Sequence, residues 1–201
     1  MAGDRQIQLP EPNKESNVSL EKTISKRRSV RVFNQRDLNL EQIGQLLWAA
    51  QGITAEESGF GFRAAPSAGA LYPIEIYIVK SDGLFHYLPQ GHKLEILGSE
   101  DLRSKLSSAA LGQGAVSDAA IDIVICAVYS RVTGKYGQRG VRYTHIEVGH
   151  AAQNIHLQAT ALGLGSVPIG AFNDDKVKSV LALPSEQEPL YIIPVGYPSK
   201  E

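Results

Sequence analysis

The sequence has few of the features that cross-link a chain or carry it into a membrane. Of its 201 residues only Cys126 is a cysteine, which excludes an intramolecular disulfide and suits a reducing compartment. No apolar run approaches the roughly 20 residues that a membrane helix needs, and the polar segment 1–17 lacks the apolar centre of a signal peptide. We therefore expect a cytoplasmic protein with no membrane partner.

An excess of one charge is also absent. Lys and Arg number 20 against 21 Asp and Glu, and the formal net charge is -1. A dedicated nucleic-acid binder usually carries a broad basic face, so nucleic acid is not expected as a partner. The five histidines predict no metal site either, because on a helix His145 and His150 would be separated by about 140° around the axis.

The order of polar and apolar segments predicts one α+β domain over residues 19–201, preceded by an extended arm over residues 1–18. Ser19, Asn39 and Asn173 are N-cap residues in front of helical patterns. Strand patterns cover 74–80, 119–130 and 189–198, with a hairpin over 83–97, and a helix rich in small residues covers 143–162. A hairpin among interleaved helices indicates a central, mainly antiparallel sheet flanked by helices.

Motifs for several common chemistries are missing. Gly163 and Gly165 look like the start of a dinucleotide-binding fingerprint, but they follow a helix instead of a strand. Pro168 also stands where the third glycine of that fingerprint belongs. No nucleophile-elbow serine, P-loop or paired-carboxylate signature occurs, so none of these chemistries is predicted.

A compact basic cluster stands out from this neutral background. Lys26, Arg27, Arg28 and Arg31 lie within six positions, with Ser29 among them. One interpretation is a helix end, because cations near a C-terminus complement the helix dipole. The other is a phosphate site, because arginine binds phosphate oxygens in pairs and Ser29 adds a hydroxyl donor. The compact grouping favours one phosphate over a long polyanion.

Five segments, in order, resemble the flavin-dependent nitroreductase superfamily and, within it, the SagB-type dehydrogenases. They are SLEKTISKRRSVRVF, LNLEQIGQLLWAAQGI, RAAPSAGALYPIEIYIV, KYGQRGVRYTHIEVGHAAQNIHLQATALGLGSVPIGAF and YIIPVGYP, and they cover most of the chain from Leu20 to Pro198. The resemblance implies a nitroreductase-like fold and an intertwined homodimer with FMN at the subunit interface. Apolar loops such as APSAGALYP would then be covered by the second subunit.

The resemblance also implies which residues hold FMN. They fall in four groups: Arg27, Arg28, Ser29 and Arg31 at the phosphate; Pro66, Ser67, Ala68, Gly69 and Tyr72 along the ring, usually from the partner subunit; Pro168, Ile169 and Gly170 near the reactive nitrogen; and Lys200 near the phosphate. The backbone N–H of Ile169 or Gly170 would donate to that nitrogen and stabilise the reduced ring. Small residues such as Gly69 let the backbone approach the ring edge.

The sequence departs from common nitroreductases at several of these places. Ala70 and Tyr72 stand where an Asn and a Gln are usual in the ring-lining loop. Gly170 stands where an acidic residue is often found, and Lys200 is the cation available at the C-terminus. By resemblance, these changes point to the SagB branch.

One dipeptide gives candidate catalytic residues. In the azoline dehydrogenases of the SagB branch, a Lys-Tyr pair is implicated as the base that removes a proton while a hydride passes to the flavin. Lys135 and Tyr136 stand at the matching place. The alternative is that both are ordinary loop residues, with Tyr136 packed and Lys135 solvated.

These interpretations leave three functions to compare. The leading one is an FMN-dependent oxidoreductase that takes a hydride from NAD(P)H and reduces a small-molecule substrate such as a nitroaromatic or a quinone. One alternative is oxidation of an azoline ring in a modified peptide, which normally needs a partner protein. The other is a flavin-binding module without turnover. Oxidation of NAD(P)H with a quinone or nitro acceptor distinguishes the first function from the other two.

Overall fold

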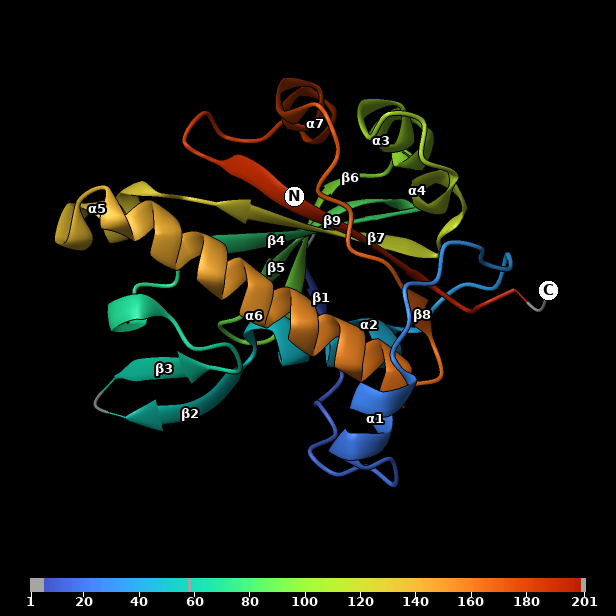
Figure 1. The fold of residues 1–201 in the computed structure, drawn as a ribbon, viewed down its shortest axis with the longest axis horizontal. Coiled ribbons are helices and arrows are strands. Elements are labelled where there is room, and N and C mark those ends of the chain that lie inside the picture. Colours follow the sequence, from blue (N-terminus) through green and yellow to red (C-terminus); the bar gives the residue numbers. More distant parts are fainter. Residues whose placement is uncertain (1–5, 58, 200–201) are drawn as a thin grey trace, which may run out of the picture.

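A central antiparallel sheet is the frame of the computed structural model, which describes residues 6–57 and 59–199 (Figure 1). Its strands are β1 (Gln6–Gln8), β4 (Ile74–Lys80), β5 (Gly83–Leu88), β6 (Lys93–Gly98), β7 (Ile121–Ala127), β8 (Gly165–Ser166) and β9 (Glu188–Gly196). They lie in the order β1-β6-β5-β4-β7-β9-β8, and each neighbouring pair is antiparallel. A separate hairpin joins β2 (Ile53–Glu57) to β3 (Phe60–Arg63). The predicted α+β class with a mainly antiparallel sheet is confirmed.

The helices begin largely where local chemistry requires. They are α1 (Leu20–Lys26), α2 (Leu40–Gln51), α3 (Arg103–Ala109), α4 (Gly114–Asp118), α5 (Ser130–Tyr136), α6 (Arg139–Ala161) and α7 (Asp174–Leu181). Ser19 and Asn173 each accept a hydrogen bond from the backbone N–H three residues on, and Asn39 forms a capping box with Gln42. The predicted starts of α1, α2 and α7 are therefore confirmed.

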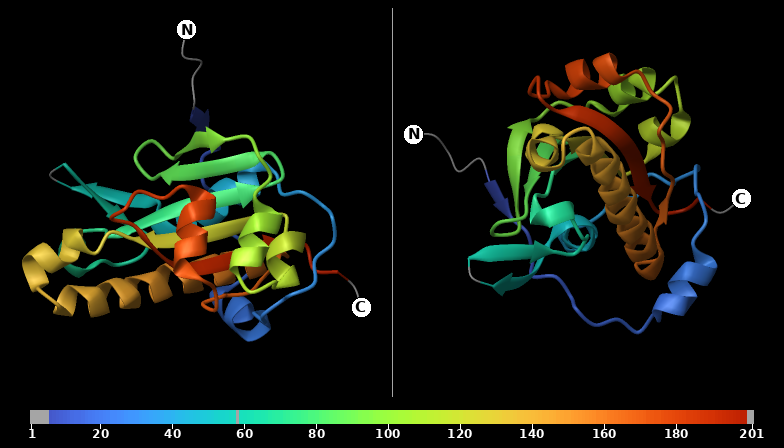
Figure 2. Two further views of the ribbon diagram at one scale, coloured as in Figure 1. Left: turned by 90° about the horizontal axis from the view of Figure 1, so that it is seen from above. Right: turned by 60° about the vertical axis from the view of Figure 1, so that its left-hand side comes forward.

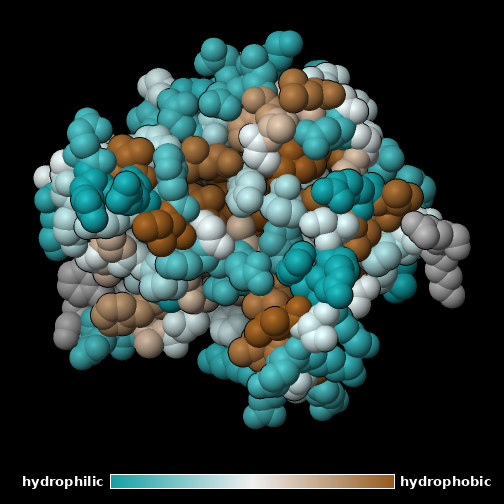
Figure 3. Space-filling view, in the orientation of Figure 1, coloured by the Kyte–Doolittle hydropathy of each residue, from teal (hydrophilic) through white to brown (hydrophobic). Residues whose placement is uncertain are grey.

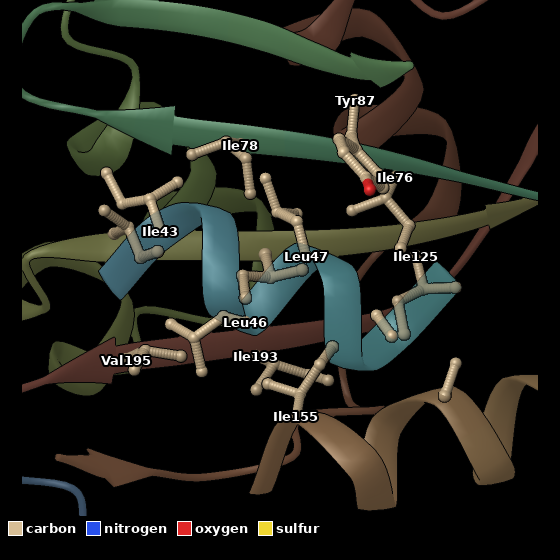
Figure 4. Close-up of a cluster of buried hydrophobic side chains, with 14 of the residues drawn as sticks. Ile43, Leu46, Leu47, Ile76, Ile78, Tyr87, Ile125, Ile155, Ile193 and Val195 are labelled. Carbon is tan, nitrogen blue, oxygen red and sulfur yellow. The ribbon is translucent and has the colours of Figure 1, made fainter. Parts of the chain in front are cut away.

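Helices cover both faces of the sheet, and a hydrophobic core lies under each layer (Figure 2). Under α2 and α6, Leu46 and Ile155 pack with Ile193 of β9 (Figure 4). On the opposite face the core lies under α3, α4 and α7. Every residue of β7 is buried because this strand lies between the two cores, which explains its continuous apolar sequence.

The long helix α6 connects two distant regions of the molecule (Figures 1 and 2). Its 23 residues extend over about 33 Å. α5 and the 3-10 turn Ala68–Ala70 lie near its first turns, whereas α1 and β8 pack near its other end. The helix begins at Arg139, earlier than the predicted span of 143–162, so α5 and α6 are separated by only two residues, Gly137 and Gln138.

Other segments differ from the expectation as well. Phe60–Arg63 forms β3, where the sequence predicted no strand, and Lys135 and Tyr136 lie in α5 instead of a loop. The N-terminal arm is extended, but β1 pairs with β6 at the edge of the sheet, and Leu9 is buried. Among the described residues, no helix combines the length and apolar character needed to span a membrane.

Candidate functional site

The basic segment leaves α1 and lies against β8. Arg27 ends α1 by donating its backbone N–H to the preceding turn, and the Val30 N–H donates to the Ser166 carbonyl at 3.0 Å. Val30 covers Gly165 so closely that a Cβ on Gly165 would lie 2.6 Å from the Val30 Cβ. Only a glycine fits this contact without displacement, and the contact fixes the path of the basic segment.

The arginines of this segment are not equivalent. Arg28 Nη1 donates to the carbonyls of Ser25 at 3.0 Å and Arg27 at 2.7 Å, so part of its guanidinium closes the end of α1. Among the described residues, Arg27 and Arg31 take part in no ion pair. Arg31 and Ile169 line one cavity of about 300 Å³. Arg27 and Arg31 are therefore available for an anion, whereas Arg28 partly fits the helix-end interpretation.

A buried histidine lies behind this segment, at a place that sequence reasoning did not assign. Ser29 is exposed and pairs with Ser166 in a short parallel bridge. The Ser166 hydroxyl contacts His156 Nδ1 at 2.7 Å, and His156 Nε2 is buried with no hydrogen-bond partner within residues 6–57 and 59–199. Burial and the charge of Arg27 lower the pKa of His156 to about 4, so the imidazole is neutral at pH 7. Lys200, expected at the same phosphate, lies outside the described residues.

The segment Pro168–Gly170 offers one free backbone donor. The Ile169 N–H donates to the Ile192 carbonyl at 2.8 Å, so it is not available to a ligand, and the expectation that it could be is corrected. The Gly170 N–H donates to no acceptor among the described residues. A Cβ on Gly170 would meet only the Tyr191 ring, at 3.6 Å. Gly170 thus leaves both a donor and open space beside the Arg31 cavity.

The loop of residues 66–72, here called the bed loop, has an unusual backbone. Gly69, Ala70 and Tyr72 have φ angles of 64°, 54° and 46°. Such left-handed conformations disfavour residues with a Cβ, so the surrounding contacts must hold Ala70 and Tyr72 in place. Pro66, Ser67 and Ala68 line a cavity of about 270 Å³ against α6.

Tyr72 is the point at which the bed loop is held. Its N–H donates to Ser67 Oγ at 2.9 Å, and its hydroxyl accepts from the Arg63 N–H at 3.2 Å. The Arg63 guanidinium lies over the Tyr72 ring at 4.4 Å. Arg131 of α5 donates from Nη1 to the Tyr72 carbonyl at 3.0 Å. These contacts connect β3, the bed loop and α5 into one unit.

Lys135 and Tyr136 reach the bed loop within the same chain. A Cβ built on Gly69 would lie 2.8 Å from Tyr136 Oη and 3.1 Å from Lys135 Nζ. Lys135 Nζ also lies 5.4 Å from the centre of the Tyr136 ring. The absence of a side chain on Gly69 therefore makes room for both candidate catalytic groups at the surface of the loop.

Glu147 of α6 is a buried carboxyl beside the bed loop that the sequence did not single out. Burial raises its pKa to about 7, although the neighbouring Ser67, Arg63 and Gln51 side chains act in the opposite direction. Glu147 Oε1 and Gln51 Nε2 are both buried and have no hydrogen-bond partner in the part of the chain that the structure describes. Arg63 Nη1 donates to Gln51 Oε1 at 2.9 Å. The cluster therefore holds an exchangeable proton close to neutral pH.

The predicted site residues thus form two groups. Arg27 and Arg31 lie with the Pro168–Gly170 segment near one end of α6, and Lys135 and Tyr136 lie with the bed loop near the other (Figure 1). The bed-loop cavity is lined by α6 residues from Tyr143 to His150, and His156, behind Arg27, lies about 9 Å further along the helix axis than His150. The two groups therefore meet different turns of the same helix.

Comparison with known proteins identifies relatives over the whole chain. The profile described as "Nitroreductase family" matches residues 24–197. A Methanocaldococcus jannaschii protein described as a nitroreductase is 41% identical over 202 residues, which cover 98% of each chain. A nitroreductase crystal structure from Ralstonia eutropha superimposes with a TM-score of 0.87 at 30% identity, covering 100% of this chain and 93% of that one. The microcin B17-processing protein McbC of Escherichia coli is 25% identical over 83% of this chain and 66% of its own length.

Proposed function

The chain belongs to the nitroreductase family, and we propose that it is an FMN-dependent homodimer that uses NAD(P)H to reduce a small acceptor such as a nitroaromatic or a quinone. Membership of this family makes the protein a flavin-dependent oxidoreductase. When bound, FMN supplies the hydride transfer between donor and acceptor. Three parts of the proposal, namely FMN as the flavin, the homodimer and the class of acceptor, are argued from the geometry of the candidate site.

The observation that carries the proposal is that the two residue groups lie at different turns of α6, beside exposed apolar side chains. A second copy of the chain would bring the bed loop of one subunit to the Arg27–Arg31 segment of the other. Apolar side chains are exposed on α1 and α6: Leu20 is 60% exposed, Ile24 56% and Ile146 50%. Figure 3 shows hydrophobic patches over these elements. Such patches are typical of surfaces that another protein covers.

Within this arrangement each group has a distinct task. Arg27 and Arg31 bind the phosphate, with the neutral His156 behind them. The Gly170 N–H donates a hydrogen bond to the ring, and its missing side chain leaves room for the ring face. The bed loop of the other subunit supports the ring, and Lys135 Nζ holds or releases a proton beside it.

The test is the flavin content of the purified protein. We expect a yellow dimer, and we expect Arg27→Ala and Arg31→Ala each to weaken FMN binding by up to about 3 kcal/mol, the scale of a lost hydrogen bond to a charged group. Arg28→Ala should have a smaller effect, because its Nη1 already serves two carbonyls. The matched control is Lys176→Ala, an exposed cation of α7. Full FMN affinity in both Arg27 and Arg31 variants would disprove the phosphate site, and a colourless monomer would disprove the whole proposal.

A second function is favoured by the similarity to McbC and by the contact of Lys135 and Tyr136 with the bed loop. In this function Lys135 would accept the proton that an azoline ring of a modified peptide loses on oxidation, and FMN, when bound, would supply the hydride acceptor that passes two electrons to oxygen. FMN-loaded protein that fails to oxidise NADH or NADPH with menadione would favour this function over the first. A thiazoline-containing peptide would then be the substrate to test.

A further inference from the structure

The region around the bed loop is rich in positive charge and poor in negative charge. From residue 123 to residue 146 the sequence contains no Asp or Glu, and the bed loop itself is uncharged. The same stretch contains Arg131, Lys135, Arg139 and Arg142. Positive charge is therefore concentrated beside the bed loop, although the protein as a whole is nearly neutral.

Most of these cations lack a carboxylate partner. Arg131 pairs with Glu75, but Lys135, Arg139 and Arg142 form no ion pair among the described residues. All three are exposed. Their charge therefore acts outward into solvent and is not neutralised by the fold. We call these three residues the cationic rim.

Contacts connect the cationic rim to the bed loop. Arg139 Nε donates to the Tyr143 hydroxyl at 3.3 Å, and the Tyr143 ring meets the Tyr136 ring edge to face at 5.3 Å. Tyr136 in turn reaches the position above Gly69, as Lys135 does. Lys135 and Arg139 are thus held at the loop on which the proposed function places the flavin ring, and Arg142 neighbours Arg139 on the helix surface, three residues on.

Helix stability does not explain the two rim arginines. Arg139 and Arg142 lie at the start of α6, which has no acidic residue in its first turn. Carboxylates stabilise that end of a helix, and cations destabilise it. The carboxyl closest in sequence on α6, Glu147, is buried and faces Arg63. Arg139 and Arg142 therefore lie where the helix dipole disfavours positive charge.

We propose that the cationic rim favours electron donors and acceptors that carry a carboxylate or a phosphate. The inference rests on the proposed function, which brings donor and acceptor in turn to the ring above the bed loop. A rim of this kind raises the local concentration of anions and their association rate, by about tenfold at the low end of electrostatic steering. Anionic acceptors, or the phosphates of the nicotinamide donor, are then used better than neutral molecules with the same ring.

The experiment compares two nitro acceptors of similar size, of which only one is charged at neutral pH. The ratio of kcat/KM for para-nitrobenzoate to that for para-nitrobenzamide is measured in the wild type and in Arg139→Gln/Arg142→Gln. We expect this ratio to fall about tenfold in the variant. Raising the salt concentration from 0.1 M to 1 M shortens the screening length from about 10 Å to about 3 Å, and should lower the wild-type ratio too. Lys105→Gln/Lys176→Gln, which removes two positive charges from the opposite face of the sheet, should keep the wild-type ratio.

Two further measurements separate the possible outcomes. If the variant raises the KM for NADPH relative to NADH and leaves the acceptor ratio alone, the rim recognises the phosphate of the donor. Binding of both nitro compounds, followed by the change in the flavin spectrum, gives the charge preference without turnover. FMN-loaded protein that binds but does not reduce them would contradict the proposed function and still test the rim. Equal acceptor ratios in wild type and variant, in binding as in turnover, together with an unchanged preference between NADPH and NADH, would overturn the inference.

Discussion

At one end of α6 the basic segment packs its backbone against β8, and the group buried there is a histidine. At the other end the bed loop is held by contacts with β3, with α5 and within the loop itself, and the buried group is a carboxyl. Burial acts on these two groups in opposite directions, because it disfavours the charged form of each. The pKa of His156 is lowered to about 4, and that of Glu147 is raised to about 7. The two ends therefore respond oppositely to acid, and this contrast can be tested one residue at a time.

The largest effect is expected from Glu147→Gln. The folded-state pKa of Glu147, about 7, lies above its unfolded value of about 4.3, so its contribution to stability is present below pH 4 and is lost as the pH rises through 7. The amide carries no charge and avoids this loss. We expect the variant to gain up to about 3 kcal/mol over the wild type between pH 4 and pH 8. Urea unfolding at these pH values measures the difference.

A matched control tests the burial argument for Glu147. Glu186→Gln removes an exposed carboxylate and should not reproduce the pH-dependent gain. A Glu147→Gln variant whose unfolding free energy stays parallel to that of the wild type from pH 4 to pH 8 would show that Glu147 is not held protonated by its surroundings.

His156→Gln should show the opposite trend. The folded-state pKa of His156, about 4, lies below its unfolded value of about 6.5, so its contribution to stability is present above pH 6.5 and is lost as the pH falls. Relative to the wild type, the variant should gain about 2 kcal/mol between pH 8 and pH 5. Unfolding at the two pH values, with and without FMN, measures this change.

FMN sharpens the comparison at His156. A phosphate beside Arg27 would offset the positive charge that disfavours the protonated imidazole, so saturating FMN should reduce the acid loss in the wild type. Saturating FMN should leave the pH-dependent stability difference of Glu147→Gln unchanged if the phosphate binds near His156 and not near Glu147. Equal protection at both residues would contradict the separation of the two ends.

The end with the basic segment was the more predictable one, because its chemistry is local. The cap at Ser19 and the close spacing of Arg27 and Arg31 are visible along the sequence. The sequence did not show that the Ile169 N–H is unavailable to a ligand, because this N–H donates to Ile192, a distant residue in β9. His156 was missed for a similar reason, since its hydrogen bond to Ser166 depends on how α6 meets β8.

The end of α6 beside the bed loop could be predicted only in part. The loop and the Lys135-Tyr136 pair were found by resemblance, but their contact depends on α5 folding back onto Gly69. The cluster around Glu147 joins Gln51, Arg63 and a loop serine from distant positions, so no spacing in the sequence reveals it. Left-handed backbone at an alanine and a tyrosine is also unexpected from residue type, because it depends on tertiary contacts.

The smallest effect on stability is expected from Gly69→Ala. The positive φ of Gly69 costs a residue with a Cβ about 1 kcal/mol. The new Cβ would also lie 2.8 Å from Tyr136 Oη, a flexible side-chain end that can move aside. We expect a larger loss in kcat/KM than in FMN affinity, because the change displaces Tyr136 and Lys135 and leaves the phosphate end alone. Gly134→Ala in α5, whose Cβ would meet nothing within 4 Å, is the control and should change neither quantity. An equal loss of FMN affinity and turnover in Gly69→Ala would mean that the two ends of α6 act as one site instead of two.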